Sequence, residues 1–183
     1  MKQIYVMAAL FLALTTGCKS EKKNAEEETR RIFQIESVDE HPGLQRMQVL
    51  RTHQDVVCKG AKFQVSIERT PSDNLPHVKS DMGLFVDNEI KVKIVRENGK
   101  ALLDKTFTKN DFKAHLSEKY LKNSILVGLA FDDVRTAENN QITLAVSLSY
   151  PMTDLYIPFT LVVSQDGKLS ISKDEEMGGA PNE

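Results

Sequence analysis

Apolar and polar residues alternate one by one along most of this chain, and no other feature of the sequence constrains its fold as strongly. The clearest run is Lys62–Glu68, in which every second residue is apolar. Ile142–Ser149 and Leu155–Val163 have the same spacing. Successive side chains of a strand point to opposite faces of its sheet, so this period predicts half-buried strands rather than amphipathic helices.

Short runs of turn residues separate the alternating segments, which predict about nine short strands. The expected strands are Ile32–Val38, Leu44–Val57 as one long or bent strand, Lys62–Glu68, Glu89–Arg96, Ala101–Phe107, Ile125–Phe131, Ile142–Ser149, Leu155–Val163 and Leu169–Ser172. Pro158 has no N–H to donate to a sheet ladder, which suggests an edge strand or a bulge. Short strands with short connections favour a mainly β fold, an antiparallel β-sandwich or a flattened barrel.

Several connections carry their own signals. Asn98–Gly99 is the strongest hairpin signal, because both central positions of the favoured two-residue turn need a positive φ. Gln165–Lys168 predicts a second tight hairpin, whereas Leu75–Asp81 and Asp132–Asn140 are expected to be loops. In Ile125–Phe131 the odd-numbered residues are apolar and the even-numbered residues between them are apolar or glycine, so both faces of this strand are expected to be covered.

One short helix is expected near residues 110–121. Thr108 or Asn110 can cap its first turn. Phe107 and Phe112 flank its start, and we expect them to dock the helix on the sheet.

The N-terminus has the three-part layout of a secretory signal peptide. Lys2 supplies a positive charge, Ile4–Leu14 is apolar and uncharged, and the small residues Thr15–Gly17 precede Cys18. The apolar run is shorter than the roughly 20 residues that a membrane-spanning helix needs. We therefore expect residues 1–17 to be removed on export.

Cys18, placed directly after a small residue, resembles the cysteine of the lipobox of bacterial lipoproteins. The resemblance implies a diacylated Cys18 thiol and acylation of the new N-terminus, which together hold a protein firmly on a membrane. The common motif has Leu three places before the cysteine, where this chain has Thr15, with Leu14 one step earlier. An ordinary secreted protein cut near Gly17 is the alternative.

Cleavage and composition together divide the chain into four segments. Residues 1–17 are the signal peptide, 18–31 the lipidated cysteine and a flexible charged tether, 32–174 a single β-rich domain, and 175–183 a disordered tail. The tether and the tail have too little apolar surface to fold. Residues 32–174 have the length of one domain.

The charge and composition of the chain narrow the list of partners. The formal charge is −2, and it becomes −3 if Lys2 leaves with the signal peptide and the N-terminus is acylated. A nearly neutral chain lacks the basic stripe that nucleic-acid binding needs, and it offers no polybasic patch to anionic lipids. The chain has no Trp on which a sugar could stack, although Tyr and Phe can serve.

Cys58 would have no partner in the chain once Cys18 carries lipid, so no disulfide framework is expected. We interpret Cys58 as a small buried apolar residue at the end of a strand. A reactive thiol or an intermolecular bridge is the alternative.

The remaining candidate residues are not expected to form a metal or cofactor site. None of the histidines pairs with another at ligand spacing; they are His41, His53, His77 and His115. His53, Asp55 and Cys58 lie within six residues, but a strand would point Cys58 to the opposite face from the other two. Three further residues lack the spacing of a calcium loop and are interpreted as loop caps: Asp81, Asp87 and Asn88. No Gly-rich phosphate loop and no Gly-x-Ser-x-Gly motif is present.

Several short motifs, which are turns and a helix start, carry a resemblance over most of the chain from about Gln45. They are Asn74–Asp81, Phe85–Asn88, Arg96–Gly99, Phe107–Phe112 and Pro151–Asp154. In these motifs the chain resembles a family of small exported bacterial lipoproteins, the one catalogued as domain of unknown function 4738. The resemblance implies a lipoprotein with a single domain, and it implies no activity and no catalytic residue.

Two functional hypotheses from different classes follow. The first is a non-enzymatic binding or assembly module, held on a membrane, with an envelope protein or a glycan as partner. The second is an envelope hydrolase whose residues converge only in three dimensions, with His53, Asp55, Asp87 and Asp154 as candidates. A purely structural envelope component is difficult to separate from the first by sequence.

The expected location is the bacterial cell envelope. The outer membrane, at its periplasmic face or at the cell surface, is favoured over the inner membrane. The residues that follow the cysteine, Lys19–Glu21, do not decide between these locations by any physical rule.

The lipid anchor makes a direct prediction. Cys18→Ser should move the exported protein from the membrane fraction to the soluble fraction, because the thiol is the only acceptor for the diacylglycerol. Fractionation of cells expressing each form measures the change. A Cys18→Ser protein that stays in the membrane fraction would contradict lipidation at this residue.

Overall fold

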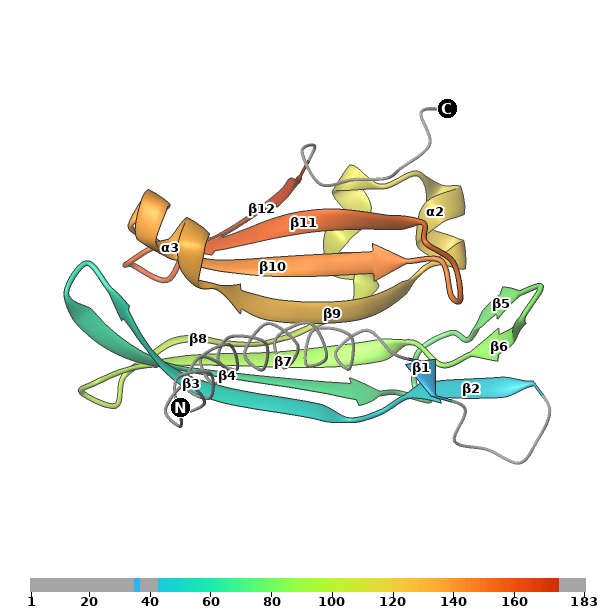
Figure 1. Ribbon diagram of the computed structural model, residues 1–183, viewed down its shortest axis with the longest axis horizontal. Helices are drawn as coiled ribbons and strands as arrows, with labels where there is room; N and C mark the ends of the chain where they lie inside the picture. Colours follow the sequence, from blue (N-terminus) through green and yellow to red (C-terminus); the bar gives the residue numbers. More distant parts are fainter. Residues whose placement is uncertain (1–34, 37–42, 175–183) are drawn as a thin grey trace, which may run out of the picture. The chain divides into compact units, whose positions relative to one another are not determined.

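Two four-stranded antiparallel sheets face each other across a shared apolar core (Figure 1). The computed structural model describes residues 35–36 and 43–174. The first sheet consists, in spatial order, of β3 (Leu50–Cys58), β4 (Ala61–Pro71), β7 (Asn88–Arg96) and β8 (Ala101–Phe107). The second consists of β12 (Leu169–Lys173), β11 (Tyr156–Val163), β10 (Ile142–Ser149) and β9 (Ile125–Asp132). The two sheets share no strand, so the fold is a β-sandwich and not a closed barrel.

The alternation in the sequence determines which side chains lie between the sheets. Phe63, Val65 and Ile67 of β4 are 3%, 1% and 6% exposed, whereas Lys62 and Gln64, which alternate with them, face solvent. Their counterparts in the second sheet are Leu144, Val146, Phe159 and Leu161. Each fully buried aliphatic or aromatic side chain contributes roughly 1.5–3 kcal/mol, so this shared core is the main source of stability.

A third, smaller sheet has an apolar cluster of its own. It consists, in order, of β1 (Ile35–Glu36), β2 (Leu44–Met47), β6 (Gly83–Phe85) and β5 (Val78–Ser80), and β2 pairs with β6 in parallel. Ile125 and Val127 of β9 pack into this second cluster, while Leu126 and Leu129 belong to the main core. Both faces of β9 are therefore covered, as predicted from its sequence.

The expected long strand Leu44–Val57 is interrupted at Gln48 and Val49, which lie between β2 and β3. The two halves belong to different sheets. The buried guanidinium of Arg69 donates to the carbonyl oxygens of Gln48, at 3.0 Å, and of Val127, at 2.7 Å. The side chain thus supplies a hydrogen bond to a carbonyl at the point where the ladder is interrupted.

Two further strand predictions differ from the structure. The loop expected over Leu75–Asp81 contains β5, which forms a hairpin with β6. Of the expected strand Ile32–Val38, Ile35–Glu36 forms β1, and the other residues lie outside the described part of the chain.

The single helix expected near residues 110–121 is two short helices, η1 (Lys109–His115), a 3₁₀-helix, and α2 (Glu118–Asn123). Thr108 caps η1, and its backbone N–H donates to Asp111 Oδ2 at 2.9 Å. The backbone is extended at Leu116, with φ −126° and ψ 146°, and Ser117 Oγ then caps a new helix by accepting from the N–H of Tyr120. A second capping residue inside the helical pattern therefore divides it.

The polar segment Asp132–Asn140, expected to be a loop, contains the helix α3 (Asp133–Asn139). Asp132 Oδ1 accepts the backbone N–H of Arg135 at 2.8 Å, and Asn140 ends the helix in the left-handed conformation, with φ 54°. A helix this short has no apolar stripe of its own, so its polar sequence predicts a loop.

The hairpin turns were located correctly, but one turn type was wrong. At Asn98–Gly99 only Gly99 has a positive φ, 80°, and Arg96 and Lys100 close a three-residue loop. The two-residue turn with two positive φ values lies instead at Lys59 and Gly60, with φ 51° and 75°.

Pro158 lies on β11, which is an inner strand of its sheet. The β11–β12 register begins one residue later, with Phe159 opposite Lys173. The carbonyl oxygen of Pro158 accepts the backbone N–H of Asp174, just past the end of β12, at 3.0 Å. The position without an N–H therefore faces the end of β12, and the ladder with β10 is unaffected. No helix in the described part of the chain is long and apolar enough to cross a membrane.

The core predicts the effect of one truncation. Phe107 and Phe112 are both 0% exposed, and the ring of Phe112 lies 5.0 Å from that of Phe159 across the core. Phe112→Ala should lower the free energy of unfolding by about 3–5 kcal/mol, because it removes a buried ring and leaves a cavity. Urea titration measures the loss, and Lys113→Ala, next to it but exposed, should change stability by less than about 0.5 kcal/mol.

Candidate functional site

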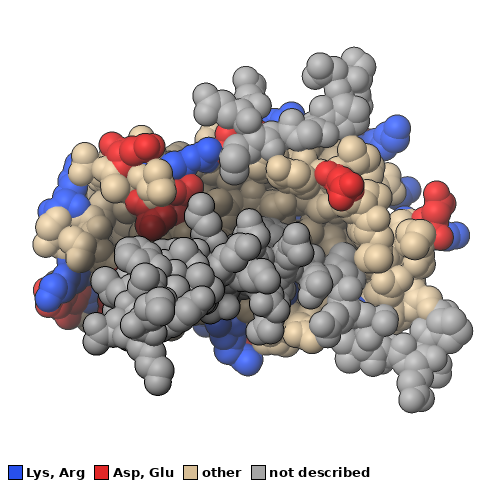
Figure 2. Space-filling model, in the orientation of Figure 1, with Lys and Arg blue, Asp and Glu red and all other residues tan. Residues whose placement is uncertain are grey.

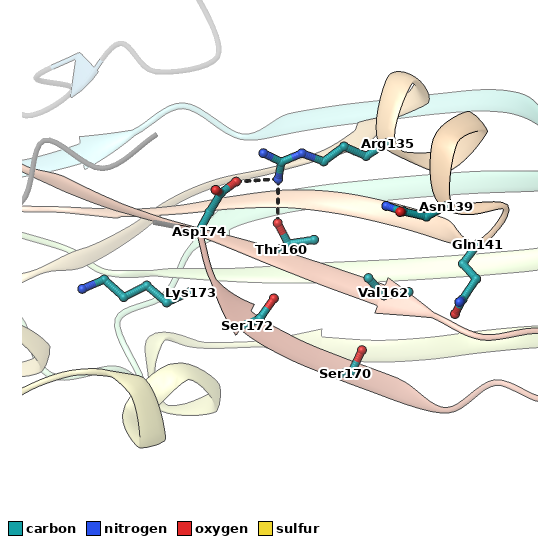
Figure 3. Close-up of a pocket in the computed structure, with 9 residues that line it drawn as sticks. All are labelled: Arg135, Asn139, Gln141, Thr160, Val162, Ser170, Ser172, Lys173 and Asp174. Atoms are coloured by element: carbon teal, nitrogen blue, oxygen red, sulfur yellow. Dashed lines mark hydrogen bonds and ion pairs between the residues drawn. The ribbon is translucent and has the colours of Figure 1, made fainter. Parts of the chain in front are cut away.

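A groove of about 760 Å³ lies on the outer face of the second sheet, beside α3 (Figure 3). It is open to solvent, and eight of its nine lining residues are polar or charged. The lining residues are Arg135, Asn139, Gln141, Thr160, Val162, Ser170, Ser172, Lys173 and Asp174. We take this groove as the candidate binding site.

The floor of the groove follows from the same alternation that builds the core. Thr160 and Val162 of β11 are the neighbours in sequence of core residues, so they point outward. In the β11–β12 register Thr160 lies opposite Ser172, and Val162 lies opposite Ser170. Cross-strand partners lie side by side on one face, so three hydroxyl groups gather around one apolar side chain.

Arg135 of α3 forms the wall of the groove and is held by three neighbours. Its Nη1 donates to Thr160 Oγ1 at 2.7 Å and lies 2.5 Å from Asp174 Oδ2, as Figure 3 shows. Its Nε lies 3.7 Å from Asp132 Oδ2. Two carboxylates offset its charge, so the groove has fixed hydrogen-bonding groups and little net charge to attract an ion.

The surface charges agree with this. Where described residues are visible in Figure 2, basic and acidic side chains lie near one another. A ligand of the groove would therefore be recognised by hydrogen bonds to hydroxyl and amide groups rather than by long-range attraction.

A second polar cluster is buried between the sheets, around Asp87. Its Oδ1 accepts the backbone N–H groups of Asn88, at 2.8 Å, and of Leu126, at 2.9 Å. Its Oδ2 lies 3.3 Å from the ammonium of Lys109, which also donates to the carbonyl oxygen of Ser124 at 2.8 Å. The side chains of Asp87 and Lys109 are 1% and 9% exposed.

Burial dominates the electrostatics of this cluster. Desolvation raises the pKa of the Asp87 carboxyl, while Lys109 and the two backbone N–H groups act in the opposite direction. The amide of Asn88 donates to the carbonyl oxygen of Leu126 at 2.9 Å. These contacts join the starts of β7, β9 and η1, so they position structure, in agreement with the interpretation of Asp87 and Asn88 as caps.

The candidates for a hydrolase do not form one site. His53 and Asp55 share the exposed outer face of β3, and His53 Nδ1 lies 2.8 Å from Ser66 Oγ. Asp87 is buried in the cluster above, and Asp154 lies in the exposed turn after β10. Of these candidates, the structure thus places together only His53 and Asp55, which are already two residues apart in sequence.

Other candidate residues are buried, pair with a neighbouring side chain or pack against the core. Cys58 is 5% exposed at the end of β3, and burial raises the pKa of its thiol, as expected for a buried apolar residue. His77 pairs with Asp73, at 3.6 Å, and His115 packs near the ring of Phe159. Cys18 and His41 lie outside the described residues.

No three His, Cys, Asp or Glu side chains of the described residues lie close enough together to hold a metal ion.

The sequence pattern did not predict the groove residues. The sequence predicts a loop at Arg135 and the end of the domain at Asp174. The one available signal was the outward-facing hydroxyl series Thr160, Ser170 and Ser172.

Comparison with the sequence models of protein families gives a match. The sequence model of the family described as Domain of unknown function (DUF4738) matches residues 31–171, which include every described strand in whole or in part. No curated protein matches the chain.

The buried pair predicts a pH-dependent loss of stability. Lys109→Met leaves the Asp87 carboxylate buried without its cation, which should cost about 3–5 kcal/mol at pH 7. An acid whose pKa is higher in the folded state gains stability relative to the unfolded state as pH falls. The deficit of Lys109→Met should therefore shrink as the pH falls toward the raised pKa, which urea titrations across pH would measure.

A double variant supplies the control. Asp87→Asn with Lys109→Met keeps an oxygen for the two backbone N–H groups and removes both charges, so it should recover most of the stability at pH 7. A deficit of Lys109→Met that is independent of pH would show that the Asp87 charge is not its cause.

Proposed function

The chain belongs to the family described as Domain of unknown function (DUF4738), and since this description states no activity, we propose a function from the residues themselves: a lipid-anchored, non-enzymatic binding or assembly module of the bacterial cell envelope. The outer membrane is its proposed location, with the domain on the periplasmic face or at the cell surface.

The junction at Cys18 carries this proposal. An uncharged apolar run, three small residues, the cysteine and then an abrupt change to charged residues make up the sequence around it. Lipid at this position leaves a tether of residues 18–31 before the domain. Fully extended, these residues would reach at most about 45–50 Å, enough for the domain to reach a partner near the membrane.

The groove beside α3 supports the binding part of the proposal. Hydroxyl and amide side chains line it, and Arg135 is fixed by Thr160 and by the carboxylates of Asp132 and Asp174. Fixed hydrogen-bonding groups lower the entropy cost of binding a polar partner. An envelope protein segment or a glycan fits this chemistry, and the near-neutral charge of the chain argues against nucleic acid.

The proposal predicts what a crosslinking experiment in intact cells will capture. The lipidated protein should give one dominant partner, and the Cys18→Ser form should lose it because it is no longer held near the membrane. Ser172→Trp, which places a large ring in the groove, should also lose the partner while the protein remains in the membrane fraction.

Thr106→Trp is the matched control, since Thr106 is an exposed residue of β8, a strand of the other sheet. It should capture the same partner as the unaltered protein. Equal capture by Ser172→Trp would contradict the assignment of the groove, and equal capture by Cys18→Ser would contradict the role of the anchor.

A further inference from the structure

The strand β3 is the edge of the first sheet, and among the described residues it has a strand neighbour, β4, on one side only. It is nine residues long and contains no proline. Residues 51–55 are exposed on both faces of the strand. Proteins normally protect a long edge strand with proline, lysine, a bulge or a covering segment, since such an edge can pair with another strand.

The register identifies which backbone groups face the open side. The carbonyl oxygen of Lys62 accepts the N–H of Glu97, on the β7 side of β4. The backbone N–H and C=O groups of Lys62 therefore point toward β7, and those of Phe63 point toward β3. Phe63 lies opposite Val56. Backbone direction alternates along a strand, so the N–H and C=O groups of four residues point to the open side: Arg51, His53, Asp55 and Val57.

We propose that two copies of this chain associate through β3, paired antiparallel about a twofold axis at Gln54, so that their first sheets become one continuous eight-stranded sheet. In this register Arg51 lies opposite Val57 of the second copy, and His53 lies opposite Asp55. All four outward-facing residues of each strand then form ladder hydrogen bonds. The same contacts occur twice, as a twofold interface requires.

The side chains of the outer face are complementary in this register. His53 and Asp55 form two opposed pairs of a carboxylate and a histidine, and no like charges face each other. Val57 is 65% exposed, an unusual exposure for a large apolar side chain. Arg51 of the second copy lies opposite Val57 in this register, so its aliphatic stem would contact Val57. The guanidinium Nε of that Arg51 would keep its hydrogen bond to Glu68 Oε1 of its own copy, at 2.9 Å.

The inner face of β3 gives independent support. A cleft of about 520 Å³ separates β3 from β9 and α3, with Gln54, Val56, Phe131 and Thr136 among its lining residues. Phe131 is partly exposed at this side of the sandwich. A second β3 would place its Thr52 opposite Val56 and on the same face, so it would cover the open side of this cleft.

Light scattering of the mature chain carrying Cys18→Ser tests the association. The unaltered strand should give a mass that rises with concentration toward twice that of the monomer. Asp55→Pro should remain monomeric, because it removes an outward-facing N–H without removing a bond to β4. Asp55→Ala keeps that N–H and should still dimerise, which separates the backbone effect from loss of the side chain.

Disulfide trapping tests the register on the same chain with Cys58→Ala. Gln54→Cys places two thiols opposite each other at the axis, where the Cα atoms of a non-hydrogen-bonded pair are about 4.5 Å apart, within disulfide range. It should give a covalent dimer on mild oxidation. Thr52→Cys should not, because its copies would be separated by about four residues along the strands.

Several outcomes would overturn the proposal. A monomer at every concentration would do so, as would a dimer that survives Asp55→Pro or is trapped by Thr52→Cys and not by Gln54→Cys. A monomer whose His53 and Asp55 amides exchange slowly with deuterium would show instead that another segment of the same chain covers the edge.

Discussion

A single buried carboxylate connects the parts of this sandwich that the chain must bring together. Asp87 accepts the backbone N–H groups of Asn88 and Leu126, which lie at the starts of β7 and β9, one strand in each sheet. Its other oxygen faces Lys109 at the start of η1. Apolar burial alone is non-directional and would permit the sheets to slide over each other. A charge that needs its partners at fixed positions removes that freedom, and the shared core then packs in one arrangement.

Local pattern predicted most of the sheet architecture and little of the candidate site. Strands such as β4 and β10 are fixed by alternation, because one face must be buried for the strand to be stable. The short helix α3 is not predicted by local pattern, because its formation depends on the capping contacts of Asp132 and Asn140 rather than on a periodic apolar face. The turn at Asn98–Gly99 shows the same limit, because the dipeptide is compatible with more than one loop length. The groove joins residues 135, 160 and 174, whose proximity comes only from the packing of α3 against the outer face of the second sheet.

The two surfaces assigned here lie on different sheets. The groove occupies the outer face of the second sheet, and the open edge of β3 belongs to the first sheet. A ligand in the groove would leave the backbone groups of β3 accessible. A pair of copies joined through β3 would present two grooves and, with the anchor proposed at Cys18, two points of membrane attachment. Simultaneous attachment at two points raises effective affinity without any new contact.

The strand β1 has a mechanical consequence for an anchored protein. It pairs with β2 through two residues only, Ile35 opposite Met47 and Glu36 opposite Arg46. Tension applied from the N-terminal side reaches the domain through this pair before any other described contact. If Cys18 is anchored as proposed, such a short antiparallel pair should separate at low force and lengthen the connection between the anchor and the sandwich, which stays folded. The smallest sheet of the structure would then act as an extensible link that protects the larger two from mechanical load.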